Sequence, residues 1–288
     1  MDQRIIDLYD DFVHSHFDRR LFLERASKIV GSAAGAAALL TALKSDYALA
    51  ATISDNDPRI TAEHVTYKGA SGEVKAYLAE PKQGPAKRGS IVVVHQNRGI
   101  NPHIEDVTRR LAVEGYNALA VDFLSQFGGT PPDDDAAMKF FQKLDPAKAV
   151  GDALAAVPYL RSRPESDGKV AAIGFCWGGG IINQMAVNDP TLNAAVVFYG
   201  APPDLAAVGK IKAPLLLNYA DPKLDTRLGA LVPPYEEALK AAKIPYTLYY
   251  YEGANHGFND DTAGPRYNEA AAKLAWGRSV AFLNEKLG

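Results

Sequence analysis

Apolar residues follow two patterns along the chain, and together they predict a sheet covered by helices. Short continuous apolar runs, such as 91–94 and 118–121, are typical of strands that are buried on both faces. Between such runs, apolar residues recur at a spacing of three and four, as at Ile104, Val107 and Leu111, which predicts amphipathic helices. Strands that alternate with helices in this way predict a mostly parallel sheet with helices on both faces.

The remaining elements are expected in the same alternating order. Two segments with alternating side chains, 65–67 and 74–78, predict an antiparallel hairpin at the start of the sheet. Further strands are expected at 170–173, 194–198, 214–217 and 246–251. Helices are expected from near Pro102 to Gly115, through Phe140 and Phe141, and at 146–161, 180–188, 234–243 and 267–286. No second boundary is visible after residue 51, so residues 51–288 are predicted to form one α/β domain.

The first fifty residues differ in composition from the rest. Arg19-Arg20 precedes a mostly uncharged stretch, 29–43, and the tripeptide Ala48-Leu-Ala50. This order resembles a twin-arginine export signal with cleavage after Ala50, which predicts a periplasmic or exported protein. The stretch is short and rich in Ala and Gly, so stable membrane insertion is not expected. The alternative is a cytoplasmic protein with an amphipathic helix packed on its domain, because apolar residues fall at near-helical spacing at Ile5, Ile6, Leu8, Tyr9 and Phe12.

Composition narrows the classes of function. The chain has 288 residues, 47% of them hydrophobic, and a net charge of −3, which gives no electrostatic case for binding nucleic acid. It contains one cysteine, so an internal disulfide is excluded. Its six histidines lack the spacing of a zinc site, and the sequence therefore indicates no metal.

One heptapeptide, Gly174-Phe-Cys-Trp-Gly-Gly-Gly180, stands between a predicted strand and a predicted helix. Strand, Gly-x-Cys-x-Gly and helix form the layout of a nucleophile elbow, in which a sharp turn exposes one side chain at the edge of a sheet. The flanking glycines are required because a Cβ there would collide with the neighbouring strand and helix. The heptapeptide thus makes Cys176 a candidate nucleophile, whereas a buried and inert cysteine is the alternative.

A nucleophilic thiol needs a base, and the base needs a group that orients it. His256 lies directly after the strand predicted at 246–251, at the same edge of the sheet as Cys176. The loop after the strand 214–217 offers two candidate acids, Asp221 and Asp225. Either carboxylate can accept the imidazole N–H, and the other would then cap a helix or a turn.

An acyl-transfer site also needs donors for the oxyanion. The backbone N–H of Trp177, which follows the nucleophile at a helix N-terminus, is expected to be one donor. The second is expected from the loop 95–99, where Asn97 is our choice and Gly99 allows the loop to bend close to the site. Two such donors lower the barrier by about 2.7–4 kcal/mol each.

Three segments together resemble the dienelactone hydrolase family of α/β-hydrolases: 174–180, His95-Gln-Asn-Arg-Gly-Ile-Asn-Pro-His-Ile-Glu-Asp106 and Gly253-Ala-Asn-His-Gly-Phe258. The resemblance covers about residues 60–287. In that family a Cys-His-Asp triad opens the lactone of dienelactone without a metal or an organic cofactor. It implies that Cys176 is the nucleophile and that His256 is the base and later the acid. The family acid closes a Gly-x-x-Asp turn. The segment 220–225 resembles that turn with a small insertion, and the Thr-Arg that follows it favours Asp225 over Asp221 as the acid.

The chain departs from the family pattern at two positions. Gln96 stands where the family often has a glutamate that keeps the resting thiol protonated, so we expect a resting thiolate paired with His256. Asp260 stands where family members that act on dienelactone have an arginine for the substrate carboxylate. Arg98 is a candidate substitute for that arginine. A less acidic ester or lactone is therefore a credible small-molecule substrate.

The sequence thus predicts a carboxylic ester or lactone hydrolase, with Gln96, Arg98, Phe123 and Tyr199 as candidate substrate-binding residues and with no cofactor. The alternative is a protein of the same fold without turnover that uses Cys176 as a redox-sensing or ligand-binding thiol. A peptidase of this fold is less favoured, because no propeller or large lid domain is present.

Overall fold

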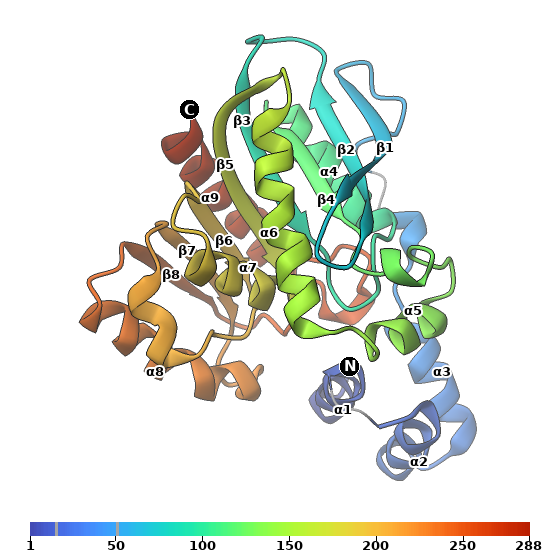
Figure 1. Ribbon diagram of the computed structural model, residues 1–288. Helices are drawn as coiled ribbons and strands as arrows, with labels where there is room; N and C mark the ends of the chain where they lie inside the picture. Colours follow the sequence, from blue (N-terminus) through green and yellow to red (C-terminus); the bar gives the residue numbers. More distant parts are fainter. Residues whose placement is uncertain (15–16, 50–51) are drawn as a thin grey trace.

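The computed structural model describes residues 1–14, 17–49 and 52–288, and its strands form one mixed sheet (Figure 1). The strands are β1 (Ile60–Lys68), β2 (Glu73–Pro81), β3 (Arg88–Val94), β4 (Asn117–Val121), β5 (Ser166–Phe175), β6 (Ala194–Phe198), β7 (Leu215–Ala220) and β8 (Tyr246–Tyr251). Their order across the sheet is β1-β2-β4-β3-β5-β6-β7-β8. β2 runs antiparallel to both β1 and β4, and all other neighbours are parallel. The predicted fold class, an α/β-hydrolase sheet with an antiparallel hairpin at its start, is confirmed.

Helices cover both faces of this sheet, as predicted. Figure 1 shows α6, α7 and α8 in front of the sheet and α4 and α9 behind it. The α-helices are α1 (Gln3–His14), α2 (Arg19–Val30), α3 (Ala33–Leu43), α4 (Pro102–Val113), α5 (Asp134–Phe141), α6 (Pro146–Ser162), α7 (Trp177–Asn188), α8 (Thr226–Ala241) and α9 (Glu269–Leu287). Short 3-10 turns lie at Tyr47–Leu49, Ser125–Phe127, Leu205–Lys210 and Gly264–Arg266.

Two helices begin earlier than the sequence predicts. α7 begins at Trp177, so the glycines of the elbow form its first turn, where they let the helix backbone approach Gly200 closely. α8 begins at Thr226 rather than near residue 234, because the side chain of Asp225 accepts a hydrogen bond from the N–H of Leu228 and caps the helix. Pro234, which we expected at the start, lies inside this helix together with Pro233.

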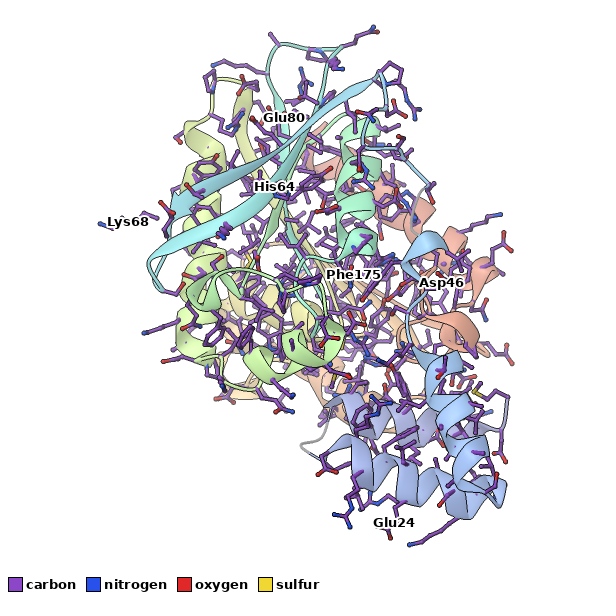
Figure 2. The ribbon with its side chains drawn as sticks, turned by 90° about the vertical axis from the view of Figure 1, so that its right-hand side faces the viewer. Glu24, Asp46, His64, Lys68, Glu80 and Phe175 are labelled. Atoms are coloured by element: carbon purple, nitrogen blue, oxygen red, sulfur yellow. The ribbon has the colours of Figure 1, made fainter. Side chains whose placement is uncertain are left out.

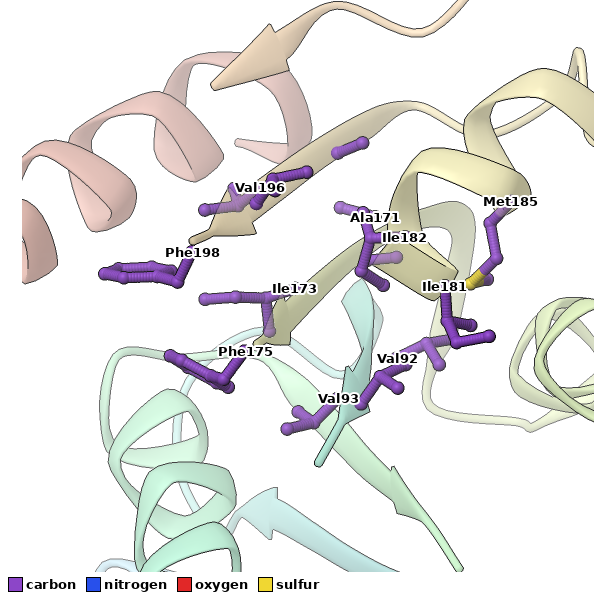
Figure 3. Packing of buried hydrophobic residues seen from close by; sticks show 14 of the residues in the cluster. Val92, Val93, Ala171, Ile173, Phe175, Ile181, Ile182, Met185, Val196 and Phe198 are labelled. Carbon is purple, nitrogen blue, oxygen red and sulfur yellow. The ribbon is translucent and has the colours of Figure 1, made fainter. Parts of the chain in front are cut away.

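The main core lies on both faces of the sheet, and the part between the sheet and α7 fixes the position of the elbow. Figure 3 shows Ile181, Ile182 and Met185 of α7 facing the sheet, with Phe175 and Phe198 at the ends of their strands. The rings of these two phenylalanines lie 4.9 Å apart and are fully buried. Because the strand and the helix on either side of the elbow are both buried, the turn between them is held rigidly.

The first three helices form a small cluster with its own apolar contacts. These contacts join Ile5, Tyr9 and Phe12 of α1 to Phe22 of α2 and Leu40 of α3. Figure 2 shows Glu24 on the outer side of this cluster and Asp46 on the connection to the sheet domain, where its N–H donates to the carbonyl of Thr262.

α1 has the amphipathic character that the spacing predicts, with its apolar face buried. The expected cleavage position at Ala50 lies outside the described residues. No described helix is by itself long and apolar enough to cross a membrane, and α2 and α3 meet those requirements only as a pair bent by 113°.

Candidate active site

Cys176 occupies a strained turn between β5 and α7. Its backbone angles, a φ of 56° and a ψ of −117°, lie outside the regions that residues other than glycine usually adopt. A Cβ on Gly174 would overlap the carbonyl of Gly178, and one on Gly178 would overlap the carbonyls of the chain at Val94 and His95. The elbow geometry expected from the sequence is therefore present, and both glycines are required for the reason given above.

The close approach at Gly178 also brings the elbow against the loop 95–99. Gly99 has a φ of +75°, and a side chain there would overlap Thr130, so this glycine does allow the tight bend. The N–H of Trp177 lies in the first turn of α7, where backbone N–H groups have no acceptor within the helix. The side-chain amide of Asn97 donates to the carbonyl of Val13 at 2.7 Å. If Asn97 serves as an oxyanion donor, it must therefore do so through its backbone N–H.

His256 and Asp225 form a buried hydrogen-bonded pair. The distance from Nδ1 of His256 to Oδ2 of Asp225 is 2.7 Å, and both side chains are almost fully buried. Asp221 instead accepts hydrogen bonds from the N–H groups of Lys223 and Gly253 and holds the turn in which it lies. The structure thus places Asp225, and not Asp221, in contact with the imidazole.

The charges around His256 favour its protonated form. Burial lowers the pKa of this histidine, but Asp10, Cys176 and Asp225 together raise the pKa to about 9. The pKa of Asp225 is affected in the opposite direction: burial raises it, and the charge and hydrogen bond of His256 more than compensate, so that it lies below the usual range. An imidazolium beside Cys176 is the partner that a thiolate requires.

A pocket of about 270 Å³ opens beside the nucleophile. It is lined by Cys176, Trp177, Gly180, Ile181, Gln184, Tyr199, Ala201, Pro202 and Arg227. Tyr199, a predicted substrate-binding residue, lines it, and its ring lies 5.0 Å from that of His256. Its walls are mostly apolar, with Arg227 as the charged group among these lining residues, a composition that suits a small acyl group.

The other predicted substrate-binding residues, Gln96, Arg98 and Phe123, are not among the residues that line this pocket. Phe123 is buried and packs edge-on against Trp177, with ring centroids 5.1 Å apart. Arg98 is also buried, because it pairs with Asp134 at 3.3 Å and donates to the hydroxyl of Tyr9 at 2.8 Å. Their contacts make both residues supports of the site.

The two positions at which the chain departs from the family pattern contact each other. The side-chain amide of Gln96 donates to Oδ2 of Asp260 at 3.2 Å. Asp260 also accepts hydrogen bonds from the N–H and the hydroxyl of Thr262, so its carboxylate is well satisfied. A buried carboxylate at this place disfavours a negatively charged substrate group nearby.

Asp10, which the sequence does not single out, also belongs to this region. It lies on α1, and its two neighbours in space, Asp225 and His256, are each more than two hundred residues away in the chain. Its only signal in the sequence is a position on the helix next to the buried Tyr9, and that signal does not name a partner. The contact depends on how α1 packs on the sheet domain.

Within the described part of the chain, two groups of His and Asp side chains have donor atoms within 4.8 Å of one another, a spacing that would accommodate a metal ion: Asp10, Asp225 and His256, and His103, Asp260 and Asp261. In the second group, Arg110 contacts the carboxylate of Asp261, to which His103 is also bonded at 2.8 Å. In the first, Nδ1 of His256 is already engaged by Asp225. Both groups carry their own positive charge, and we assign them as hydrogen-bonded ion networks.

Comparison with known proteins gives a consistent result. The model of the dienelactone hydrolase family matches residues 74–287, and a second model, described as YqhI-like, matches residues 1–31. A protein of Saccharolobus solfataricus with the provisional name carboxymethylenebutenolidase is 31% identical over 261 residues, which is 77% of this chain and 97% of that protein.

Solved structures agree. A Klebsiella pneumoniae protein provisionally named dienelactone hydrolase has a TM-score of 0.70 and 29% identity, and the match covers 78% of this chain and 98% of that one. A dienelactone hydrolase-like promiscuous phosphotriesterase from metagenomic libraries has a TM-score of 0.68 and 26% identity, with 80% and 100% covered.

Proposed function

This chain belongs to the dienelactone hydrolase family, a family of hydrolases, and on that premise we propose that it cleaves carboxylic esters or lactones through an acyl-cysteine intermediate. The observation that carries the proposal is the buried His256–Asp225 pair beside a cysteine held at a positive φ. Such an arrangement supplies a nucleophile, a proton donor and an orienting acid in one place.

In the first half of the proposed reaction, the thiolate of Cys176 attacks the carbonyl carbon and forms a C–S bond. The N–H groups of Trp177 and Asn97 stabilise the oxyanion that develops. When the tetrahedral intermediate collapses, the C–O bond of the ester breaks, and the imidazolium of His256 gives its proton to the departing alkoxide. An acyl-cysteine, a neutral histidine and a free alcohol result.

In the second half, neutral His256 takes a proton from water while the water oxygen attacks the thioester. The C–S bond then breaks, the carboxylic acid leaves, and the thiolate and the imidazolium are restored. Asp225 stays ionised throughout and orients the ring through Nδ1. No group beyond ester and water is consumed.

The surroundings of the site favour an uncharged substrate near His256. Asp10 and Asp225 place carboxylates near His256, and a buried Asp260 stands where the family's arginine would be. Aryl esters with a neutral acyl group and neutral lactones are therefore the preferred class of substrate. Because one structural relative is described as a promiscuous phosphotriesterase, a neutral phosphotriester is a useful additional probe.

The specific alternative is a protein without catalytic turnover in which Cys176 acts as a redox-sensing or ligand-binding group. Cys176 is almost fully buried but lines an open pocket, and a thiolate in that position suits both functions. Hydrolysis of p-nitrophenyl acetate separates them. Sustained turnover in the wild type that is lost in Cys176→Ala supports the hydrolase. A single stoichiometric release of nitrophenol, without further turnover, supports the alternative and contradicts our proposal.

A further inference from the structure

α1 is hydrogen-bonded to two of the loops that carry the candidate site. The side chain of Gln3 donates to the side chain of Asn255, next to His256, at 2.7 Å. At the other end of the helix, the carbonyl of Val13 accepts from Asn97 at 2.7 Å. Between them, the hydroxyl of Tyr9 accepts from Arg98 at 2.8 Å. These bonds fix the helix over the loops 95–99 and 252–258.

The helix is also held from its apolar side. Tyr9 is almost fully buried, and the guanidinium of Arg266 lies 5.0 Å from the centre of its ring. The same arginine comes close to Gly257, the residue after His256. Packing and hydrogen bonds therefore determine both the position of α1 relative to the loops 95–99 and 252–258 and its rotation about the helix axis.

That rotation turns Asp10 toward the catalytic pair. One of its carboxylate oxygens lies within 4.8 Å of a carboxylate oxygen of Asp225 and of a ring nitrogen of His256. Asp10 is half-buried, so its charge is screened less than that of an exposed residue. A second carboxylate thus faces the imidazole from an element outside the sheet domain.

Among the described residues, charged and titratable groups approach His256 from five segments. Asp225 contacts it from the N-terminus of α8, and Cys176 faces it from the elbow. Tyr199 packs its ring against the imidazole from the end of β6. Asp10 approaches from α1, and Arg266, on the turn before α9, is the nearby cation. The charges of Asp10, Cys176 and Asp225 outweigh the effect of burial and favour an imidazolium.

We propose that Asp10 is a positioning residue of the active site, whose carboxylate holds His256 in the protonated state that the resting Cys176 thiolate requires. This inference rests on the proposed function, because it assigns Asp10 a part in that reaction. It acts through His256 and does not touch the substrate. The N-terminal helix then belongs to the catalytic machinery of the chain that carries it.

The test is the titration of His256 in the full-length protein, followed by NMR of ring-labelled histidine. Asp10→Asn removes the charge and keeps the shape, and we expect the midpoint to fall by about one pH unit. Asp11→Asn removes an equal charge from the exposed neighbouring position and should leave the midpoint at the wild-type pH. Asp10→Glu retains the charge and should restore most of the shift.

An unchanged midpoint in a folded Asp10→Asn protein would overturn the inference. If that variant does not fold, Asp10→Ser removes the same charge, and the same comparison is decisive. A purely structural role would alter thermal unfolding without moving the midpoint. The titration does not depend on turnover, so an unchanged midpoint would overturn the role of Asp10 without contradicting the proposed hydrolase function. Sustained turnover by Cys176→Ala would contradict the proposed function without deciding the result of the titration.

Discussion

At the scale of single residues, hydrogen bonds determine which aspartate contacts His256, a choice that the spacing of residues in the sequence leaves open. The order of segments along the chain predicts His256 as the base, but the loop after β7 contains two aspartates at suitable positions. Asp221 accepts hydrogen bonds from the N–H of Lys223 in its own turn and from the N–H of Gly253 in the loop after β8. Asp225 caps α8 with one carboxylate oxygen and contacts His256 with the other. Such a division of roles depends on the turn geometry, which the residue types alone do not specify.

The two aspartates provide a matched pair of variants. Asp225→Asn should reduce kcat/KM by on the order of a hundredfold to ten-thousandfold, because the ring of His256 loses its orienting acceptor. Asp221→Asn, in the same loop, should stay within a few-fold of the wild type. Steady-state assays with p-nitrophenyl acetate check both. Equal losses in the two variants would contradict the assignment of Asp225.

The raised pKa of His256 predicts how stability depends on pH. A histidine with a pKa of about 9 in the folded state, against roughly 6.5 in the unfolded chain, stabilises the fold fully below about pH 6.5. That contribution is lost as the pH rises through about 9. The free energy of unfolding of wild type, minus that of His256→Gln, should therefore decrease between these pH values. Urea denaturation at a series of pH values measures this difference, and a constant difference would contradict the charged pair.

At the scale of elements, close backbone approach determines where the nucleophile points. β5 and α7 meet at the elbow because glycines remove the side chains that would keep them apart. The sequence predicts this feature well, since the glycine pattern encodes a local steric requirement. It predicts the start of α8 poorly, because Pro233 and Pro234 resemble a helix start and the true cap, Asp225, has a second use in the site.

The steric requirement at the elbow is tested by adding one methyl group. Gly178→Ala should lower the free energy of unfolding by about 2 kcal/mol or more, because its Cβ would overlap backbone carbonyls that cannot move away. Gly209→Ala is the control, because a Cβ there meets nothing within 4 Å. Urea denaturation of both proteins measures the effect, and equal stabilities would show that the elbow tolerates a side chain.

At the scale of the whole molecule, the parallel sheet gathers the site from distant parts of the chain. The carboxyl ends of β3, β5, β7 and β8 meet at one edge, which is why alternating strands and helices suffice to bring the loop 95–99, Cys176, Asp225 and His256 together. The position of α1 does not follow from that rule, because it depends on side-chain contacts between the N-terminal helices and the loops of the sheet domain. The part played by Asp10 was therefore beyond the reach of the sequence pattern.

The N-terminal region connects localisation with catalysis. We propose that residues 1–50 act as an export signal, in which case cleavage after Ala50 removes α1 together with Asp10. Intact mass of protein recovered from the periplasm should then show a chain that starts at Ala51. The alkaline limb of its kcat/KM should lie at a lower pH than that of the unprocessed chain. A periplasmic protein that retains residue 1, or two forms with the same alkaline limb, would contradict this account.

The acyl-cysteine intermediate is the central claim, and rapid-quench intact mass spectrometry tests it most directly. The chain has a single cysteine, so any thioester must form at Cys176. Mixed with p-nitrophenyl acetate and quenched in acid during turnover, the wild type should gain the mass of one acetyl group, which disappears as substrate is exhausted, and Cys176→Ala should gain none. Sustained hydrolysis without this adduct, or an adduct of equal abundance in Cys176→Ala, would contradict the mechanism.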